Sequence, residues 1–169
     1  MKIAIVGAHG VGKTTLSTIL AEELGLAVIK DIVPEAYHLG FTINEETPIE
    51  TQIWLTAKQI ELERNIVNFV ADKCLIDYYI YGDVLLDDTD VKKVLKKLID
   101  RNASYDYILY IPIEFPLVDD GLRSMNPDFQ RLIDARYHEY LEDSGLEYHI
   151  IKGSIEDRLK TIRKIITPK

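Results

Sequence analysis

The sequence predicts an α/β protein of three layers, in which helices cover both faces of a sheet of five parallel strands. Two observations lead to this prediction. Short apolar segments alternate five times with segments whose apolar residues recur at helical spacing, as in parallel βαβ units with right-handed crossovers. A glycine-rich turn joins the first strand to the first helix, and such turns bind phosphate. At 169 residues the chain can cover a sheet on both faces, so we expect a single domain over residues 1–169.

The glycine-rich turn fits the pattern G-x-x-x-x-G-K-[ST], the Walker A phosphate-binding loop or P-loop. It follows an apolar strand at residues 2–6 and precedes a helix at residues 15–24. Glycines let the backbone fold around a phosphate, and the helix N-terminus adds partial positive charge. We expect Lys13 to reach the β- and γ-phosphates of ATP and the Thr14 hydroxyl to hold Mg²⁺. For His9, at a variable position of the loop, a phosphate contact and a solvent-facing role are both open. The expected nucleotide-binding residues are Gly7, Ala8, His9, Gly10, Val11, Gly12, Lys13, Thr14 and Thr15.

The next segments predict a second strand, a long helix and a third strand. The second strand covers residues 26–33 and is ended by Pro34. After a loop, Thr47 is expected to cap a helix that carries an apolar face and runs to about Val70. The expected apolar face consists of Ile49, Ile53, Ala57, Ile60 and Val67. Residues 74–77 are apolar until the final carboxylate of Asp77, and we interpret them as the third strand.

The remaining segments continue the alternation. A helix capped by Thr89 or Asp90 runs to about residue 102, and a fourth strand covers residues 105–111. Residues 113–126 are irregular and contain glycine and aspartates, which suits a mobile lid. Asn126 and Pro127 begin a helix that ends near residue 145. A fifth strand at residues 146–151 and a last helix at residues 155–166 complete the pattern.

Composition excludes several classes of protein. The formal net charge of −8 argues against a large nucleic-acid surface, since phosphate backbones are held by clustered Lys and Arg. No apolar run approaches the roughly 20 residues of a membrane span. The chain starts directly in a strand without a signal-peptide pattern, so we expect a cytoplasmic protein. The single Cys74 cannot form an internal disulfide and is expected to be a buried apolar residue.

Carboxylates that follow the strands of a parallel sheet meet at the same edge as the phosphate-binding loop. Asp77 is expected there as the carboxylate that orients Mg²⁺, with capping of the next turn as the alternative. Glu35, after the second strand, is expected to act as general base on a substrate hydroxyl, or else to be an ordinary first-turn glutamate of a helix. Asp31 is the weaker candidate because it lies inside the predicted strand.

Candidates for charge stabilisation and substrate binding lie later in the chain. Arg123, in the expected lid, could stabilise the γ-phosphoryl group during transfer. Arg131, in the following helix, is a candidate for substrate binding, although a surface salt bridge is the alternative for either arginine. Gln52, in the long helix, could pair with the edge of a base.

Together these residues resemble the small P-loop kinases often labelled AAA-domain ATPases. Those proteins are similar to deoxynucleoside and nucleoside monophosphate kinases and to the ribosylnicotinamide kinase domain. The resemblance rests on residues 7–14, Pro34-Glu35, Gln52, Asp77 and the run from Asp120 to Gln130. It implies a P-loop NTPase sheet ordered 2-3-1-4-5, ATP as phosphoryl donor, Glu35 as substrate-side base and Arg123 as a lid arginine.

The sequence departs from that family at two points. The family commonly has Asp-Arg or Glu-Arg after strand three, where this chain has Asp77-Tyr78. It often carries an arginine three residues after the strand-two glutamate, where this chain has His38. Both departures concern positions that would bind the phosphates of a substrate.

Two classes of function remain open. The leading one is an ATP-dependent phosphotransferase that acts on a nucleoside, a nucleotide or a related small hydroxyl compound; a DNA acceptor is disfavoured by the acidic charge. The alternative is a nucleotide-binding switch or slow ATPase without a small-molecule acceptor. True AAA machines are disfavoured because the chain is too short for their helical subdomain and has no Asp-Glu pair after the third strand. GTPases are disfavoured because the sequence contains no Asn-Lys-x-Asp motif to recognise guanine.

Overall fold

A computed structural model describes residues 1–166 and contains one five-stranded sheet. Every neighbouring pair of strands is parallel, and the order is β2-β3-β1-β4-β5, as predicted. The central strands are short and, apart from their first residues Lys2 and Tyr107, buried, as parallel strands covered on both faces require. The strands are β1 (Lys2–Val6), β2 (Ala27–Ile29), β3 (Phe69–Ala71), β4 (Tyr107–Tyr110) and β5 (His149–Ile150).

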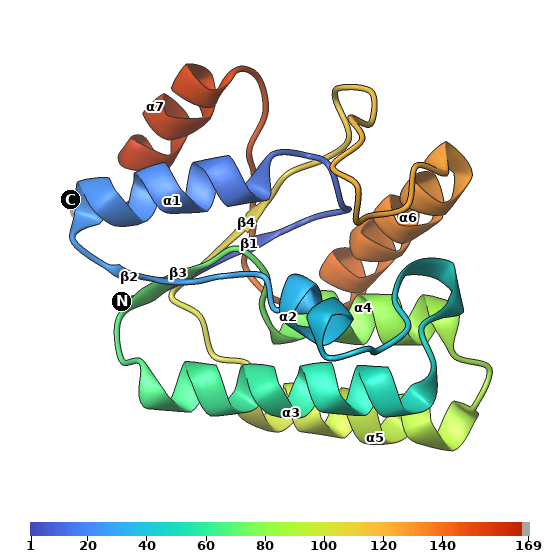
Figure 1. The fold of residues 1–169 in the computed structure, drawn as a ribbon. Helices are drawn as coiled ribbons and strands as arrows, with labels where there is room; N and C mark the ends of the chain where they lie inside the picture. Colours follow the sequence, from blue (N-terminus) through green and yellow to red (C-terminus); the bar gives the residue numbers. More distant parts are fainter. Residues whose placement is uncertain (167–169) are drawn as a thin grey trace.

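Helices cover both faces of this sheet, which gives the three expected layers. Figure 1 shows α1 and α7 on one face, and α3, α4, α5 and α6 on the other. A 3₁₀ turn, η1 (Asn44–Glu46), lies between α2 and α3. In the described part of the chain, no helix is long and apolar enough to cross a membrane. The helices are α1 (Lys13–Leu24), α2 (Val33–His38), α3 (Ile49–Asn65), α4 (Leu75–Leu85), α5 (Thr89–Asn102), α6 (Pro127–Asp143) and α7 (Ile155–Ile166).

The predicted position of the third strand is wrong. β3 is Phe69–Ala71, which pairs with both β1 and β2, and the preceding helix ends at Asn65 instead of near residue 70. Residues 74–77 instead begin α4, where Cys74 is the N-cap. Because α4 is buried on most of its surface, its apolar residues show no one-sided helical period, and a short apolar run of this kind fits a buried strand equally well.

The predicted second strand is too long. β2 ends at Ile29, so Asp31 lies in the turn beyond the strand, at the edge where ligands bind in parallel sheets. Pro34, expected to stop a strand, instead lies in the first turn of α2, where its missing N–H costs nothing.

The face that α3 turns toward the core was also predicted wrongly. Ile53 is half exposed and Ala57 is exposed, whereas the buried stripe is largely polar. Thr47 does not cap this helix but donates its hydroxyl to the carbonyl of Asn44 at 2.7 Å. Apolar periodicity therefore misplaced α3 by part of a turn, because a polar stripe faces the interior. That stripe comprises Thr51, Gln52, Leu55, Thr56, Gln59 and Glu63.

Candidate active site

The loop between β1 and α1 has the geometry that a phosphate requires. Gly7 has a φ of 145°, and a Cβ there would lie 2.4 Å from the carbonyl oxygen of Ile111. No other residue type fits this position. Lys13 lies beneath the loop, and its Nζ donates to the carbonyl oxygens of Gly7 at 2.6 Å and Ala8 at 2.7 Å. Burial lowers the pKa of Lys13 to about 8, although Asp77 and other nearby carboxylates act to raise it.

A cavity beside this loop, which we call the loop cavity, brings the nucleotide-binding candidates together. Gly10, Gly12, Lys13, Thr14 and Thr15 line it together with His9. Asp72, the first residue after β3, lines the same cavity. Burial raises the pKa of Asp72, and Lys13 and the Thr14 side chain act in the opposite direction. A carboxylate and a threonine hydroxyl at one cavity are the protein ligands that Mg²⁺ uses when phosphates and water complete its shell.

Asp77 does not follow a strand, which corrects the placement on which its predicted role in Mg²⁺ binding rested. It is fully buried in the first turn of α4. Its Oδ1 accepts from the Tyr137 hydroxyl at 2.6 Å, and its Oδ2 accepts from the Cys74 N–H at 2.9 Å. These contacts are those of a capping carboxylate. Asp77 also lies close enough to raise the pKa of Lys13.

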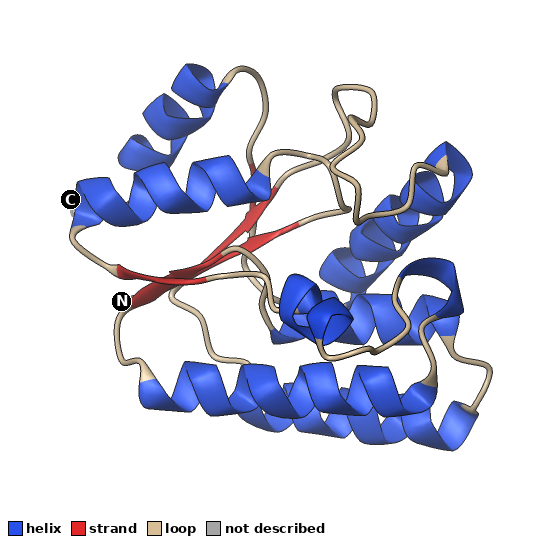
Figure 2. Cartoon of the chain, viewed as in Figure 1, coloured by secondary structure: helices blue, strands red, loops and turns tan. Residues whose placement is uncertain are grey.

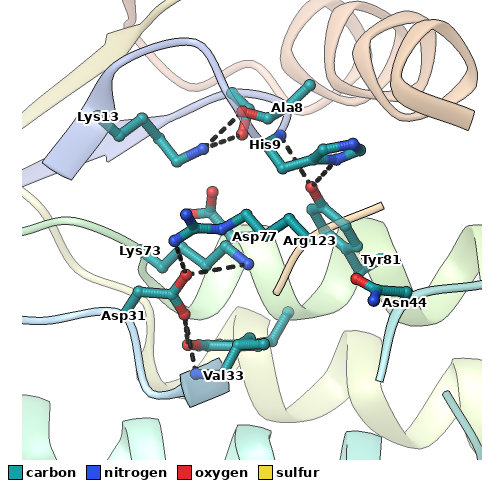
Figure 3. A network of polar contacts seen from close by, with 12 residues as sticks. Ala8, His9, Lys13, Asp31, Val33, Asn44, Lys73, Asp77, Tyr81 and Arg123 are labelled. Carbon is teal, nitrogen blue, oxygen red and sulfur yellow. Dashed lines mark hydrogen bonds and ion pairs between the residues drawn. The ribbon is translucent and has the colours of Figure 1, made fainter. Parts of the chain in front are cut away.

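Asp31 is the carboxylate that the turn after β2 places in the site. Its side chain is 4% exposed, and its Oδ2 lies 2.9 Å from Nη2 of Arg123 and 3.5 Å from Nζ of Lys73 (Figure 3). Its Oδ1 accepts from the Val33 N–H at 2.9 Å. Burial would raise the pKa of Asp31, but Lys73, Arg123 and this N–H together hold it below its ordinary value. Asp31 is therefore an ionised, buried carboxylate.

A second cavity, which we call the inner cavity, lies next to the loop cavity. His9 and Arg123 line both cavities, so the two meet at these residues. Most of its lining is apolar or aromatic, with a few polar groups. The lining comprises His9, Val33, Ile43, Asn44, Thr47, Gln52, Leu55, Lys73, Tyr78, Tyr81, Leu85, Arg123 and Phe129.

Gln52, which lines the inner cavity, carries an unused hydrogen-bonding group. Its side chain is 1% exposed, and its Oε1 has no hydrogen-bond partner among residues 1–166. Gly82 of α4 permits the close packing here, because a Cβ would lie 2.8 Å from Leu95 and 3.7 Å from Gln52. A buried amide without a partner is costly unless a ligand completes it.

His9 belongs to the inner wall and is not solvent-facing. It is 3% exposed, its backbone N–H donates to the Tyr81 hydroxyl at 3.0 Å, and its Nδ1 lies 3.1 Å from the same oxygen. Its ring stacks near Phe129, with ring centroids 5.6 Å apart. Burial, together with the nearby Lys73 and Lys13, lowers the pKa of His9 to about 4, so the imidazole is neutral at pH 7.

Two other candidates lie outside both cavities. Glu35 is exposed on α2 and is not among the described residues that line either cavity. Arg131 is exposed on α6 and forms an ion pair with Asp128. Arg123 lies in the long loop between β4 and α6, which is drawn in tan like the other loops in Figure 2. Its guanidinium pairs with Asp120 at 2.6 Å as well as with Asp31.

Sequence reasoning missed Asp72 and Lys73 and underrated Asp31. A signal for the first two was present, because an acidic–basic pair was expected after strand three and Asp72-Lys73 is such a pair. The misplaced strand concealed it. With β3 at residues 69–71, the chain has this pair with lysine in place of arginine.

Comparison with known proteins supports the resemblance seen in the sequence. A family model described as an AAA domain matches residues 2–158. Deoxyguanosine kinase of Bacillus subtilis (strain 168) is 27% identical over 152 residues, which cover 82% of this chain and 73% of that protein. A structure of deoxyadenosine kinase from M. mycoides, with products dCMP and dCDP, has a TM-score of 0.77 at 19% identity and covers 98% of both chains. Thymidylate kinase from Candida albicans has a TM-score of 0.67 at 16% identity, over 98% of this chain and 90% of that chain.

Proposed function

Because the chain belongs to the AAA domain family, matched over residues 2–158, and is an enzyme of the P-loop kinase type, we propose that it transfers the γ-phosphoryl group of ATP to a hydroxyl of a nucleoside. The observation that carries this proposal is a buried, ionised Asp31 that pairs with Arg123, one of the two residues at which the loop cavity meets the inner cavity. The curated relative is a deoxyguanosine kinase, and nucleosides are its named substrate class.

The donor side of the proposal concerns the loop cavity. Backbone N–H groups of the loop and Lys13 would bind the β- and γ-phosphates, since Lys13 can exchange its two carbonyl acceptors for phosphate oxygens. Thr14 and Asp72 would hold Mg²⁺, which neutralises developing charge on the phosphates when it is bound. Asp72 takes this role in place of Asp77, because Asp72 lines the cavity.

The acceptor side favours a neutral nucleoside over a nucleotide. Among the described residues that line the inner cavity, the lysine and arginine side chains are Lys73 and Arg123, and both are paired with Asp31. A phosphate on the acceptor would face this carboxylate and would have to compete with it for the same two cations. A hydroxyl has no such conflict. Gln52 would then pair with the edge of the base, and the aromatic lining would pack against it.

Asp31 is the proposed general base, in place of the exposed Glu35. Its Oδ2 is bound to Arg123 in this structure, so proton transfer requires that the guanidinium turn toward the transferring phosphoryl group. That movement uncovers the carboxylate and raises its proton affinity, because the nearest positive charge has left. Arg123 would in the same step stabilise charge on the phosphoryl oxygens. Closure of the 113–126 loop, the proposed lid, would exclude water.

A panel assay tests the proposal. The protein is incubated with ATP, Mg²⁺ and each of a set of nucleosides and nucleoside 5′-monophosphates, and the phosphorylated products are separated by anion exchange. We expect one or a few nucleosides to yield monophosphates. Exclusive phosphorylation of monophosphates would contradict the nucleoside assignment. ATP hydrolysis that no compound on the panel changes would favour the switch or slow ATPase instead.

A further inference from the structure

Asn44, which the proposed mechanism leaves without a role, holds the loop that carries Arg123. It is the N-terminal residue of η1, in the segment between α2 and α3, and it lies 79 positions before Arg123 in the sequence. It lines the inner cavity. The segment that carries it therefore belongs to the acceptor side of the site.

The side-chain amide of Asn44 forms hydrogen bonds with the backbone on both sides of Arg123. Its Nδ2 donates to the carbonyl oxygen of Leu122 at 2.9 Å, and its Oδ1 accepts from the N–H of Ser124 at 3.1 Å. One side chain thus uses its donor and its acceptor on the residues that immediately flank the arginine. A contact from Ser124 Oγ to the Glu45 carboxylate adds a third link between the same two segments.

The backbone of Asn44 is in an unfavourable conformation that the site maintains. Asn44 has a φ of 69°, the only positive φ of a residue other than glycine among residues 1–166. Asparagine tolerates this left-handed region better than most residues, but the conformation remains less favourable than the ordinary right-handed or extended ones. The Thr47 N–H and hydroxyl both donate to the Asn44 carbonyl oxygen, at 3.2 Å and 2.7 Å, and hold the turn. Strain kept in place in this way is common at functional sites.

The same short segment forms one wall of the inner cavity. Ile43, Asn44, Thr47 and Gln52 all line it. A ligand packed against this wall would contact the turn that contains Asn44, whose side chain holds residues 122–124 in place. The guanidinium of Arg123, in turn, lines the loop cavity and pairs with Asp31. Contacts therefore run from the wall of the inner cavity through Asn44 to the residues that flank Arg123, and Arg123 itself reaches the loop cavity.

We propose that Asn44 is a positioning residue that couples occupation of the inner cavity to the placement of Arg123 at the phosphates. The proposal rests on the proposed nucleoside kinase function. It gives the enzyme a means to stabilise the transferring phosphoryl group only when an acceptor is present, so that ATP is not hydrolysed idly. Its measurable form is a coupling free energy: nucleoside binding should tighten binding of an ATP analogue, and the reverse.

The test measures this coupling at equilibrium. Affinity for a non-hydrolysable ATP analogue with Mg²⁺ is measured with and without the nucleoside that the panel assay identifies, by calorimetry. In the parent we expect the nucleoside to tighten the analogue by about 5-fold or more, within the range usual for coupled sites. Asn44→Ala should reduce this factor to below about 2-fold, and the affinity for each ligand alone is measured on the same variant so that the factor is a ratio within one protein. Asn65→Ala, an exposed asparagine at the other end of α3, is the matched control and should behave as the parent.

A double-variant cycle separates positioning from a merely structural role. In the Arg123→Ala background the coupling should already be lost, and Asn44→Ala should remove nothing further. Asn44→Gly, which relieves the backbone strain but lacks the amide, should resemble Asn44→Ala. Coupling that persists in Asn44→Ala would overturn the inference. So would a result in which Asn44→Ala reduces the coupling factor equally in the parent and in the Arg123→Ala background. A parent protein that phosphorylates no nucleoside would instead overturn the proposed function, so the two failures are distinguishable.

Discussion

Replacement of Asp31 by asparagine is the sharpest test of the proposed chemistry. Asparagine keeps the shape of the side chain and can still accept the Val33 N–H, but it cannot take a proton from a hydroxyl. Removal of a general base typically slows the chemical step by about 10²–10⁴, which is about 2.7–5.4 kcal/mol in activation free energy. We therefore expect kcat for phosphoryl transfer to fall by that factor, with ATP affinity largely unchanged.

The same substitution has a cost in stability that the structure lets us bound. Lys73, with 6% of its side chain exposed, loses its ion pair with Asp31 at 3.5 Å. Loss of one partner of a buried pair costs about 3–5 kcal/mol, but Arg123 is 25% exposed and keeps Asp120. We expect about 2–3 kcal/mol, or a fall in Tm of roughly 5–10 °C for a chain of this length. Because the folded pKa of Asp31 is lowered, this stability is present at neutral pH and is lost only as pH falls below about 4.

The assay compares Asp31→Asn with Glu35→Gln, the exposed carboxylate on the neighbouring helix. Initial rates of transfer and of nucleoside-independent hydrolysis are measured at 25 °C, after thermal unfolding has shown that both variants are folded. Glu35→Gln should retain the parental kcat within about twofold. If Asp31→Asn transfers within about threefold of the parental rate, Asp31 is not the base. A large loss in Glu35→Gln would return that role to Glu35.

Three further predictions concern the rest of the site. Lys13→Met should abolish ATP turnover, and turnover like the parent's would refute the P-loop role. The folded pKa of Lys13 (about 8) lies below its unfolded value, so the parent, unlike this variant, should become more stable by roughly 3 kcal/mol as pH rises from 8 to 10.5. Denaturant titrations without nucleotide measure this difference. Asp72→Asn should raise the Mg²⁺ concentration needed for half-maximal activity at least several-fold. Asp77→Asn should lower Tm, because it weakens the contact with Tyr137, and should leave the Mg²⁺ titration unchanged. The opposite pattern would restore Asp77 as the metal carboxylate. Gln52→Leu should raise KM for the nucleoside by about 10-fold or more with little change in KM for ATP, and equal changes in both would remove Gln52 from the acceptor site.

The order of elements could be predicted because local patterns specify it. The P-loop sequence identifies the turn between β1 and α1, where glycine alone permits the backbone at Gly7. Proline and asparagine at residues 126–127 mark the start of α6, where Asn126 accepts from the N–H of Asp128 and Phe129. Alternation of apolar segments then leaves the parallel sheet as the simplest arrangement.

Prediction failed where an apolar run was short or where polar groups face inward. Residues 74–77 fit a strand or a buried helix, and the choice depends on whether β1 and β2 pair with this run or with Phe69–Ala71. Glu63 faces the core on α3, because the Leu75 N–H and the Tyr105 hydroxyl, both distant in the sequence, donate to it, and apolar periodicity cannot reveal such partners. Gln52 also faces inward, although its Oε1 has no partner among residues 1–166.

The sequence by itself determined the phosphate-binding loop, the α/β class and the sheet order expected from its resemblance to P-loop kinases, because these depend on short-range backbone geometry and on a family pattern. The tertiary structure alone decided where the carboxylates lie. Asp72 lines the loop cavity and Asp31 is buried against Arg123, which lines both cavities, whereas Glu35 is exposed, because the ends of β2 and β3 and the burial of these side chains depend on the folded sheet. Arg123 bonds to Asp31, and Asn44 bonds to Leu122 and Ser124 on either side of Arg123. These bonds span more than 70 positions of sequence and likewise exist only after folding, since the long loop after β4 returns over the turns that follow β2 and α2.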